Sequence, residues 1–226
     1  MLFRSTPAMK LYSANLSPYG SRARLALYAK GLDAEIALPP GGPTSAEYRA
    51  INPTGKIPCL VTRDGHCVPE SDTIVEYLED AFPETPLRPV DAVARAKARS
   101  LSRIGELYVL GPIFTLFGQM NPATRDPALT EKTLADLEKG VAALEAALSG
   151  EAYAAGPEFT TADCQLAPTV FYLPRMAAIF GREGLLADKP KLAAYMESVK
   201  QHPHVRRVYV EMAQAVKTFQ ETGQIT

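Results

Sequence analysis

Three short stretches near the start of the chain combine residue types that suit chemistry at a helix or strand entry. The first is residues 17–20 (SPYG), between an expected strand and an expected helix. Backbone N–H groups at a helix N-terminus point outward without partners, and the helix dipole adds about half a positive charge there. A thiol held at this place has a lowered pKa, and the Ser17 hydroxyl can donate a hydrogen bond to a thiolate. The alternative is that Ser17 only caps the helix, with Pro18 at its first position.

The second stretch is residues 52–58 (NPTGKIP), a loop that enters a strand. Pro58 lacks an N–H for the strand ladder and therefore belongs at a strand start, and X–Pro bonds are the common cis peptides. A cis bond would turn the backbone of Ile57 toward an incoming peptide, and Lys56 beside it is suited to meet a carboxylate. The alternative is an ordinary turn with a surface lysine.

The third stretch is residues 69–72 (PESD), again at the expected start of a helix. Ser71 is expected to cap this helix while the exposed amides bind a carboxylate, and Glu70 is expected to accept hydrogen bonds from an ammonium group. A plain capped helix is the alternative. Taken together, the three stretches favour a thiolate, an extended peptide backbone and an α-amino acid terminus. Glutathione carries all three groups.

The elements that must position these stretches show α/β character over residues 9–82, where short apolar runs alternate with helical stretches. An Asp64-Gly65 turn is expected to join the last two strands. The expected order is βαβ, helix, ββα, with strands at 9–13, 34–38, 58–62 and 66–68, helices at 21–30 and 45–51, and a last helix carrying Ile74, Val75, Leu78 and Phe82 at helical spacing.

The remainder of the chain predicts a different architecture. Residues 1–8 are expected to form a flexible leader and residues 83–90 a short, proline-rich linker. From Asp91 strand signals vanish and long amphipathic stretches predict an all-helical domain over 91–226. Thr160 and Asp163 match a capping box at one helix start. Pro168 inside that helix and Pro174 after it predict a kink and an early end.

Composition excludes several classes of function. The 24 basic and 25 acidic residues give a formal charge of -1, so no global field attracts nucleic acid or an anionic membrane. Three cysteines are too few for a disulfide framework, and the three histidines lack metal-ligand spacing. No apolar run approaches the roughly 18 residues that span a membrane. A cytoplasmic protein without metal, membrane or nucleic-acid partners is expected.

Four stretches in this order and spacing resemble the glutathione S-transferase superfamily, from Lys10 to about Phe219: LYSANLSPYGSRARLAL, NPTGKIPCL, PESDTIVEYLED and FTTADCQLAP. The resemblance is to the serine type, which includes the zeta, theta, phi and tau classes. It implies an α/β thioredoxin-like N-terminal domain, over residues 9–82, that binds glutathione. It also implies an all-α helical C-terminal domain that holds a second substrate, and a homodimer.

By this resemblance Ser17 stabilises the glutathione thiolate, with Tyr12, Ser13 or Asn15 as stand-ins if Ser17 points away. The glutathione-binding residues would be Lys56 for the glycine carboxylate, Ile57 and Pro58 for the cysteinyl backbone, and Glu70 and Ser71 for the γ-glutamyl end. Where zeta members carry SSCS, Pro18, Tyr19 and Gly20 replace the last three residues, which argues against zeta isomerase activity. The turn also resembles C-P-Y-C with both cysteines gone, which argues against dithiol redox chemistry.

The resemblance places an apolar pocket for the second substrate on a long first helix and a kinked later helix of the C-terminal domain. Its candidates are Tyr19, Tyr108, Phe114, Phe117, Met120, Phe171, Tyr172 and Arg175. The expected activity is attack of the thiolate on a small hydrophobic electrophile, or a glutathione-dependent isomerisation. The alternative is a non-catalytic module that binds a ligand or a protein.

Overall fold

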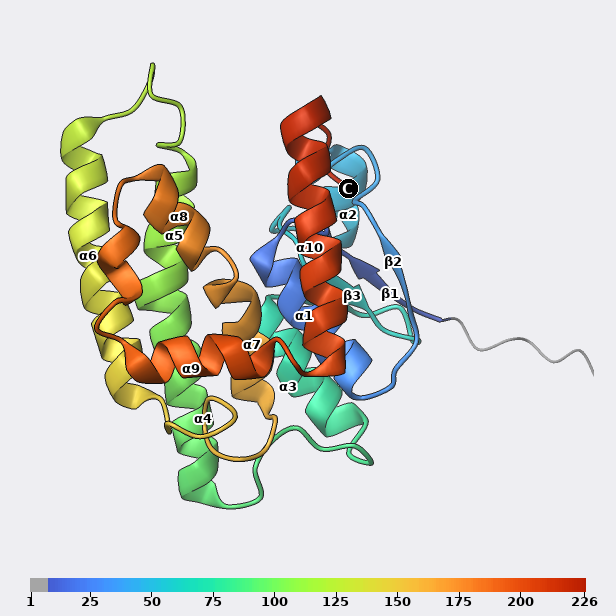
Figure 1. The fold of residues 1–226 in the computed structure, drawn as a ribbon. Helices are drawn as coiled ribbons and strands as arrows, with labels where there is room; N and C mark the ends of the chain where they lie inside the picture. The colour runs from blue at the N-terminus through green and yellow to red at the C-terminus, as the bar shows by residue number, and fades with distance from the viewer. Residues whose placement is uncertain (1–7) are drawn as a thin grey trace, which may run out of the picture. The chain divides into compact units, whose positions relative to one another are not determined.

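The computed structural model describes residues 8–226, and its contacts divide the chain into two compact units (Figure 1). The first unit contains residues up to Leu87 together with Arg206–Thr226, and the second contains Arg88–Val205. By its contacts, the C-terminal segment is therefore part of the same unit as the N-terminal residues. Except for Ala8, the expected leader lies outside the described residues.

The first unit is built on a four-stranded mixed sheet with the order β2-β1-β3-β4. Strand β1 runs parallel to β2 and antiparallel to β3, which in turn pairs antiparallel with β4. The Asp64-Gly65 turn closes the β3–β4 hairpin, with Thr62 N–H donating to the carbonyl of His66 at 2.9 Å. All four predicted strands form, at β1 (Met9–Tyr12), β2 (Ala34–Ala37), β3 (Cys59–Val61) and β4 (Cys67–Pro69).

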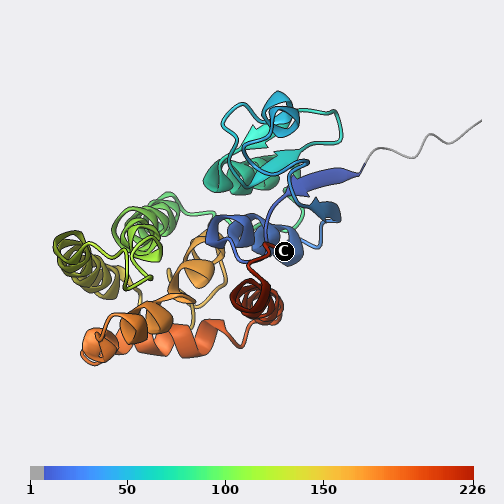
Figure 2. The ribbon, with the colours of Figure 1, turned by 90° about the horizontal axis from the view of Figure 1, so that it is seen from above.

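Helices cover this sheet because its side chains alternate between two apolar faces. On one face Tyr12 lies opposite Cys59, and both pack against Tyr48 of α2. On the other face lies the buried pair Leu11 and Leu60. Helix α3 packs on β3 and β4, and α1 packs on α3. Figure 2 shows α1 and α2 on opposite sides of the sheet. The helices of this unit are α1 (Pro18–Ala29), α2 (Ala46–Ile51), α3 (Ser71–Ala81) and most of α10 (Pro203–Thr222).

Helix α1 begins at Pro18, three residues before the predicted start at Ser21. The predicted bounds left Pro18, Tyr19 and Gly20 outside the helix, whereas the alternative in which Ser17 caps the helix already had Pro18 at its first position. Proline is accommodated at the first helical position because its missing N–H would have no partner there, and the Ser17 side chain caps the turn. The whole SPYG stretch is therefore part of the helix and its cap.

The second unit is all-helical, as predicted. Helix α7 forms its centre, since all ten of its residues are buried, and it packs against α4 and α9. The predicted capping box is confirmed at its start, where Thr160 and Asp163 bond reciprocally. The helix ends two residues after Pro168, as expected. The elements of this unit are α4 (Ala92–Ile104), η1 (Gly105–Leu110), α5 (Gly111–Phe117), α6 (Pro127–Ala147), α7 (Thr161–Val170), α8 (Leu173–Ile179), η2 (Glu183–Leu186) and α9 (Pro190–Val199).

The long first helix predicted for this unit contains a π-helical segment, η1, between α4 and α5. It lies against α6, where a Cβ added to Gly140 would come within 1.8 Å of the Tyr108 carbonyl oxygen. Glycine is therefore required at position 140 for the two helix backbones to approach this closely. No local sequence signal indicated this π-helical turn.

Candidate functional site

The β1–α1 turn holds Ser17 at the N-terminus of α1, as the sequence predicted. The backbone of Ser17 is extended, with φ −77° and ψ 121°, and its Oγ accepts a hydrogen bond from Gly20 N–H at 3.1 Å. A Cβ at Gly20 would lie 2.2 Å from Ser13 Oγ, so a larger residue there would require the Ser13 side chain to move. A serine oxygen that accepts one bond still has its O–H to donate. Capping and a hydrogen bond to a thiolate are thus compatible roles for Ser17.

The three stand-ins for Ser17 are each engaged within the first unit. Tyr12 is 8% exposed and packs edge-to-face on Tyr48, with ring centroids 5.4 Å apart. Ser13 is 3% exposed. The side-chain oxygen of Asn15 accepts a hydrogen bond from the Arg24 guanidinium. Since none of the three lies at the end of the helix axis as a cap, the geometry favours Ser17 for contact with an anion there.

Two completely buried side chains form hydrogen bonds to the loop 52–58. Tyr48 Oη and Asn52 Nδ2 both donate to the Lys56 carbonyl, at 2.7 and 2.8 Å. Burial raises the pKa of Tyr48 to about 12, so its hydroxyl stays protonated as a donor. The Ile57–Pro58 bond is cis, as predicted. Within the described chain no hydrogen bond involves the Ile57 backbone, which leaves its N–H and C=O for a peptide.

The entry to α3 differs from the prediction in one respect. The cap residue is Glu70, whereas Ser71, predicted as the cap, occupies the first helical position, and no side chain caps this helix. Glu70 has φ 67° and ψ 122°, and among the described residues it alone combines a positive φ with a side chain. The reason is the absence of a connecting loop, because β4 ends at Pro69 and a single residue must redirect the chain. Such strain is concentrated at functional sites.

This strained turn presents both predicted γ-glutamyl ligands at one helix start. The Glu70 side chain is exposed, and Ser71 is buried beside it at 5% exposure. The first amides of α3 have no helical acceptor and are available to a carboxylate. The structure therefore places an acceptor for an ammonium group and donors for a carboxylate next to each other in the chain.

In the second unit the structure brings four of the predicted pocket residues together as an aromatic cluster. Phe117 contacts Phe114 and Tyr172 with ring centroids 5.5 and 5.1 Å apart, and Phe171 lies 5.1 Å from Tyr172. Tyr172 is only 3% exposed and supports the cluster from within, whereas Phe114 is 42% exposed.

The other pocket candidates come from several different segments of the chain. Tyr108, on η1, is 55% exposed, and Arg175 is half-buried on α8. Met120 is half-buried just beyond α5. Tyr19 belongs to the first unit, where the Arg22 guanidinium lies over its ring at 4.8 Å. That these residues line one pocket for a second substrate stays a prediction.

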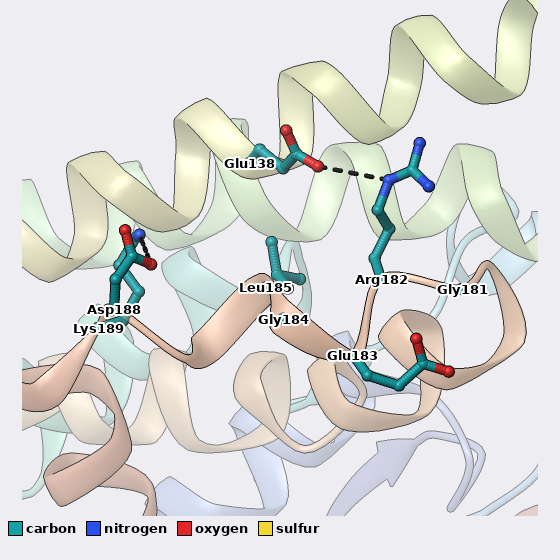
Figure 3. Close-up of a pocket in the computed structure, with 8 residues that line it drawn as sticks. All are labelled: Glu138, Gly181, Arg182, Glu183, Gly184, Leu185, Asp188 and Lys189. Atoms are coloured by element: carbon teal, nitrogen blue, oxygen red, sulfur yellow. Dashed lines mark hydrogen bonds and ion pairs between the residues drawn. The ribbon is translucent and has the colours of Figure 1, made fainter.

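A cavity of about 390 Å³ on the second unit involves none of the predicted residues (Figure 3). It lies between α6 and the segment 181–189. Arg182, at its rim, bonds to Glu131 at 2.7 Å and lies 3.5 Å from Glu138, and Lys189 pairs with Asp188. Its two cations are thus already neutralised by neighbouring carboxylates. We assign no ligand to this cavity.

Within residues 8–226 no cluster of three or more His, Cys, Asp and Glu side chains is arranged to hold a metal ion. None of the described helices has the length and apolar character needed to cross a bilayer. Cys59, next to Pro58, is buried, and burial raises the pKa of its thiol. A thiol that stays protonated is a poor nucleophile.

The sequence did not predict the residues that hold the candidate site in place through hydrogen bonds and an ion pair. Tyr48 and Asn52 hold the Lys56 carbonyl, and Arg24 and Glu211 hold the β1–α1 turn. The usable signal was Arg24, which with Arg22 is one of two arginines in the otherwise uncharged stretch that forms α1. Its partner Glu211 is too distant in sequence for any local pattern to reveal.

Comparisons with known proteins agree with this geometry. Residues 11–86 match the family model "Glutathione S-transferase, N-terminal domain", and residues 127–198 match "Glutathione S-transferase, C-terminal domain". A glutathione S-transferase from Pseudomonas putida is 30% identical over 94% of this chain and 96% of its own.

Two other similar proteins carry different names, one of a stringent starvation protein and one of a glutathione S-transferase. A stringent starvation protein A homolog from Haemophilus ducreyi is 31% identical over 85% of this chain and 86% of its own. The crystal structure of a glutathione S-transferase from Methylobacillus flagellatus, with GSH bound, superimposes with a TM-score of 0.75 at 25% identity. That match covers 89% of this chain and 98% of the other.

Proposed function

Because the chain belongs to the glutathione S-transferase family, we propose that it binds glutathione on its first unit and activates the thiol for attack on a small hydrophobic electrophile. The observation that carries the proposal is the set of three turns described above. Ser17 lies at a helix N-terminus, Ile57 has a backbone without partners in the described chain, and Glu70 and Ser71 open a second helix. Each of the three matches one part of the tripeptide.

The binding step distributes glutathione over these turns. The Ile57 N–H and C=O pair with the cysteinyl residue as a short strand, with Pro58 holding the loop at the strand start, while the exposed Lys56 ammonium meets the glycine carboxylate. Glu70 accepts from the γ-glutamyl ammonium. The first amides of α3 and the Ser71 hydroxyl donate to the γ-glutamyl carboxylate.

The chemical step requires the thiol to lose its proton near neutral pH. The positive end of α1 and the Ser17 O–H both favour the thiolate over the thiol, because each interacts more strongly with the charged form. The thiolate sulfur then attacks the electrophile, forming a carbon–sulfur bond as the leaving group departs. We propose that aromatic residues of the helical unit bind the electrophile. These are Phe114, Phe117, Phe171 and Tyr172.

The decisive test is the ultraviolet absorbance of the bound thiolate, titrated against pH in the wild type and in Ser17→Ala. The variant keeps α1 and its dipole but loses one charge-assisted hydrogen bond of about 1.5–3 kcal/mol, which corresponds to a rise of about one to two units in the thiol pKa. Glutathione affinity should be nearly unchanged. Coincident titration curves would show that Ser17 is only a cap.

A second candidate function is that of a non-catalytic binding module. The relative from Haemophilus ducreyi supports this candidate, because its name describes no transferase. Immobilised glutathione followed by a screen of electrophiles and unsaturated acids separates the two. Retention without turnover of any substrate, conjugated or isomerised, would favour the module. Arg175→Ala in the same screen tests whether Arg175 selects acidic second substrates.

We also propose that the chain acts as a homodimer, as its family resemblance implies. Light scattering should then give about twice the chain mass of 24.5 kDa. A mass near that of one chain at micromolar concentration would contradict the proposal.

A further inference from the structure

Arg24 is a completely buried cation on α1 that bonds to both sides of the turn containing Ser17. Its guanidinium donates to the Asn15 carbonyl at 3.0 Å and to the Asn15 side-chain oxygen. It also donates to Ser21 Oγ at 2.7 Å, and Ser21 Oγ in turn donates to the Ser17 carbonyl at 2.8 Å. The residues before and after Ser17 are therefore tied to one rigid, planar group.

The charge of Arg24 is balanced from α10, whose residues from Arg206 onward belong to the same unit. Glu211 lies 3.2 Å from Arg24 Nη1. The Glu211 carboxylate also accepts from Tyr28 Oη at 3.1 Å and from Arg207 Nε at 3.1 Å, and the Arg207 guanidinium stacks 3.6 Å above the Tyr28 ring. Glu211 thus has a fixed position set by three donors.

A second contact joins the same turn to the segment after α10. The Asn15 N–H donates to the carbonyl oxygen of Thr226 at 2.6 Å. Asn15 is therefore held through its side chain, its carbonyl and its N–H, two residues before Ser17.

From this arrangement we infer that the Arg24–Glu211 ion pair is a positioning device that holds the Ser17 hydroxyl in place for the glutathione thiolate. The inference rests on the proposed role of Ser17. Neither residue of the pair needs to touch glutathione, because both act through the backbone on either side of Ser17.

Weakening the Arg24–Glu211 pair should loosen the turn that contains Ser17. A buried guanidinium without a counter-charge is costly and will draw in water or shift its side chain. The Asn15 and Ser21 contacts then loosen, and the Ser17 hydroxyl spends less time in donating geometry. Since a hydrogen bond stabilises the thiolate only while it is made, the thiol pKa should rise in proportion to the time that it is lost.

The test is Glu211→Gln, which removes the charge but keeps the size of the side chain and an oxygen for Tyr28. Thiolate titration should show the pKa of bound glutathione rising by about half a unit, with turnover below that pKa falling about threefold. Glutathione affinity should change less than twofold. The control is Glu221→Gln on the same helix, where an exposed carboxylate pairs loosely with Lys217 at 3.9 Å. It should leave all three quantities unchanged.

The mechanism is identified by repeating Glu211→Gln in a Ser17→Ala background. If the pair acts through Ser17, it should produce no further rise in the thiol pKa there, because the hydrogen bond is already absent. An equal rise in both backgrounds would overturn the inference, because the pair would then act on the thiolate by a route that does not involve the Ser17 hydroxyl. Tyr28→Phe, which removes one donor to Glu211, provides a milder second variant and should shift the pKa in the same direction.

The outcomes separate this inference from the proposed function. If Ser17→Ala leaves the thiol pKa unchanged, the role of Ser17 fails and the inference falls with it. If Ser17→Ala raises the pKa while Glu211→Gln and Tyr28→Phe do not, the inference alone is overturned. Should Glu211→Gln fail to fold, as judged by circular dichroism, the result for Tyr28→Phe decides.

Discussion

Glu70 offers a test in which stability and binding should change in opposite directions. Its φ of 67° places a residue with a side chain in backbone space that glycine occupies freely. Such a conformation costs of order 1–3 kcal/mol. The protein tolerates this cost at a position where the side chain is exposed and is proposed to accept from the γ-glutamyl ammonium.

Three substitutions separate the two contributions. Glu70→Gly relieves the backbone strain, partly offset by the extra entropy of glycine in the unfolded chain, so the free energy of unfolding should rise by about 1 kcal/mol. Glu70→Ala keeps the strain and should leave stability nearly unchanged. Both variants lose the carboxylate, and each should weaken glutathione binding by about 1.5–3 kcal/mol, the range for a hydrogen bond to a charged group. Glu70→Gln retains an acceptor without charge and should lie in between.

The assays are urea denaturation for stability and isothermal titration calorimetry for glutathione affinity. The matched comparison is Glu70→Gly against Glu70→Ala, because the two share the loss of the side chain and differ in backbone freedom. If Glu70→Gly is less stable than the wild type, the strain argument is wrong. If Glu70→Ala binds glutathione as tightly as the wild type, the γ-glutamyl assignment is wrong.

Three further predictions concern contacts seen in the structure. Tyr48→Phe removes one of the two donors to the Lys56 carbonyl, so glutathione affinity should fall about 3- to 10-fold in calorimetry while the thiol pKa of bound glutathione stays constant. Burial raises the pKa of Asp163 to about 6, against about 3.9 in the unfolded chain. The folded state therefore binds the proton more tightly, and this stabilisation is complete below about pH 4 and is lost as the pH rises to about 6. Urea titrations should show the stability difference between the wild type and Asp163→Asn changing by about 3 kcal/mol across that range, and a constant difference would contradict the shifted pKa. Gly140→Ala should destabilise the chain by 3 kcal/mol or more, roughly the upper range for overpacking, because its Cβ would meet the Tyr108 carbonyl. Gly184→Ala, with open space around its Cβ, is the control and should be neutral.

The features that the sequence predicted correctly are those decided by a few neighbouring residues. The Asp64-Gly65 turn, the strands beside it and the capping box of Thr160 and Asp163 all depend on local backbone preference and short-range hydrogen bonds. The cap at Ser17 belongs to the same group. For this reason the positions of the three candidate turns were visible from residue types and spacing alone, and the resemblance of the whole chain added the ligand.

The features that only the tertiary structure decided depend on how successive elements join and on contacts between distant parts of the chain. A local rule predicts Ser71 as the cap of α3, but the direct passage from β4 into the helix forces Glu70 into that position with a strained backbone. Likewise, the close approach of η1 to Gly140 on α6 joins residues that no local pattern relates.

The support of Ser17 shows the same limit most clearly. Tyr28 and Glu211 are 183 residues apart in the sequence, and yet both belong to the network that holds Arg24 and the turn before α1. The sequence by itself predicted where an anion could be bound, because a helix start carries its amides and its dipole wherever it occurs. Only the folded chain determined which side chains hold that helix start in place, because burial and charge pairing act through space and leave no periodic signal along the sequence.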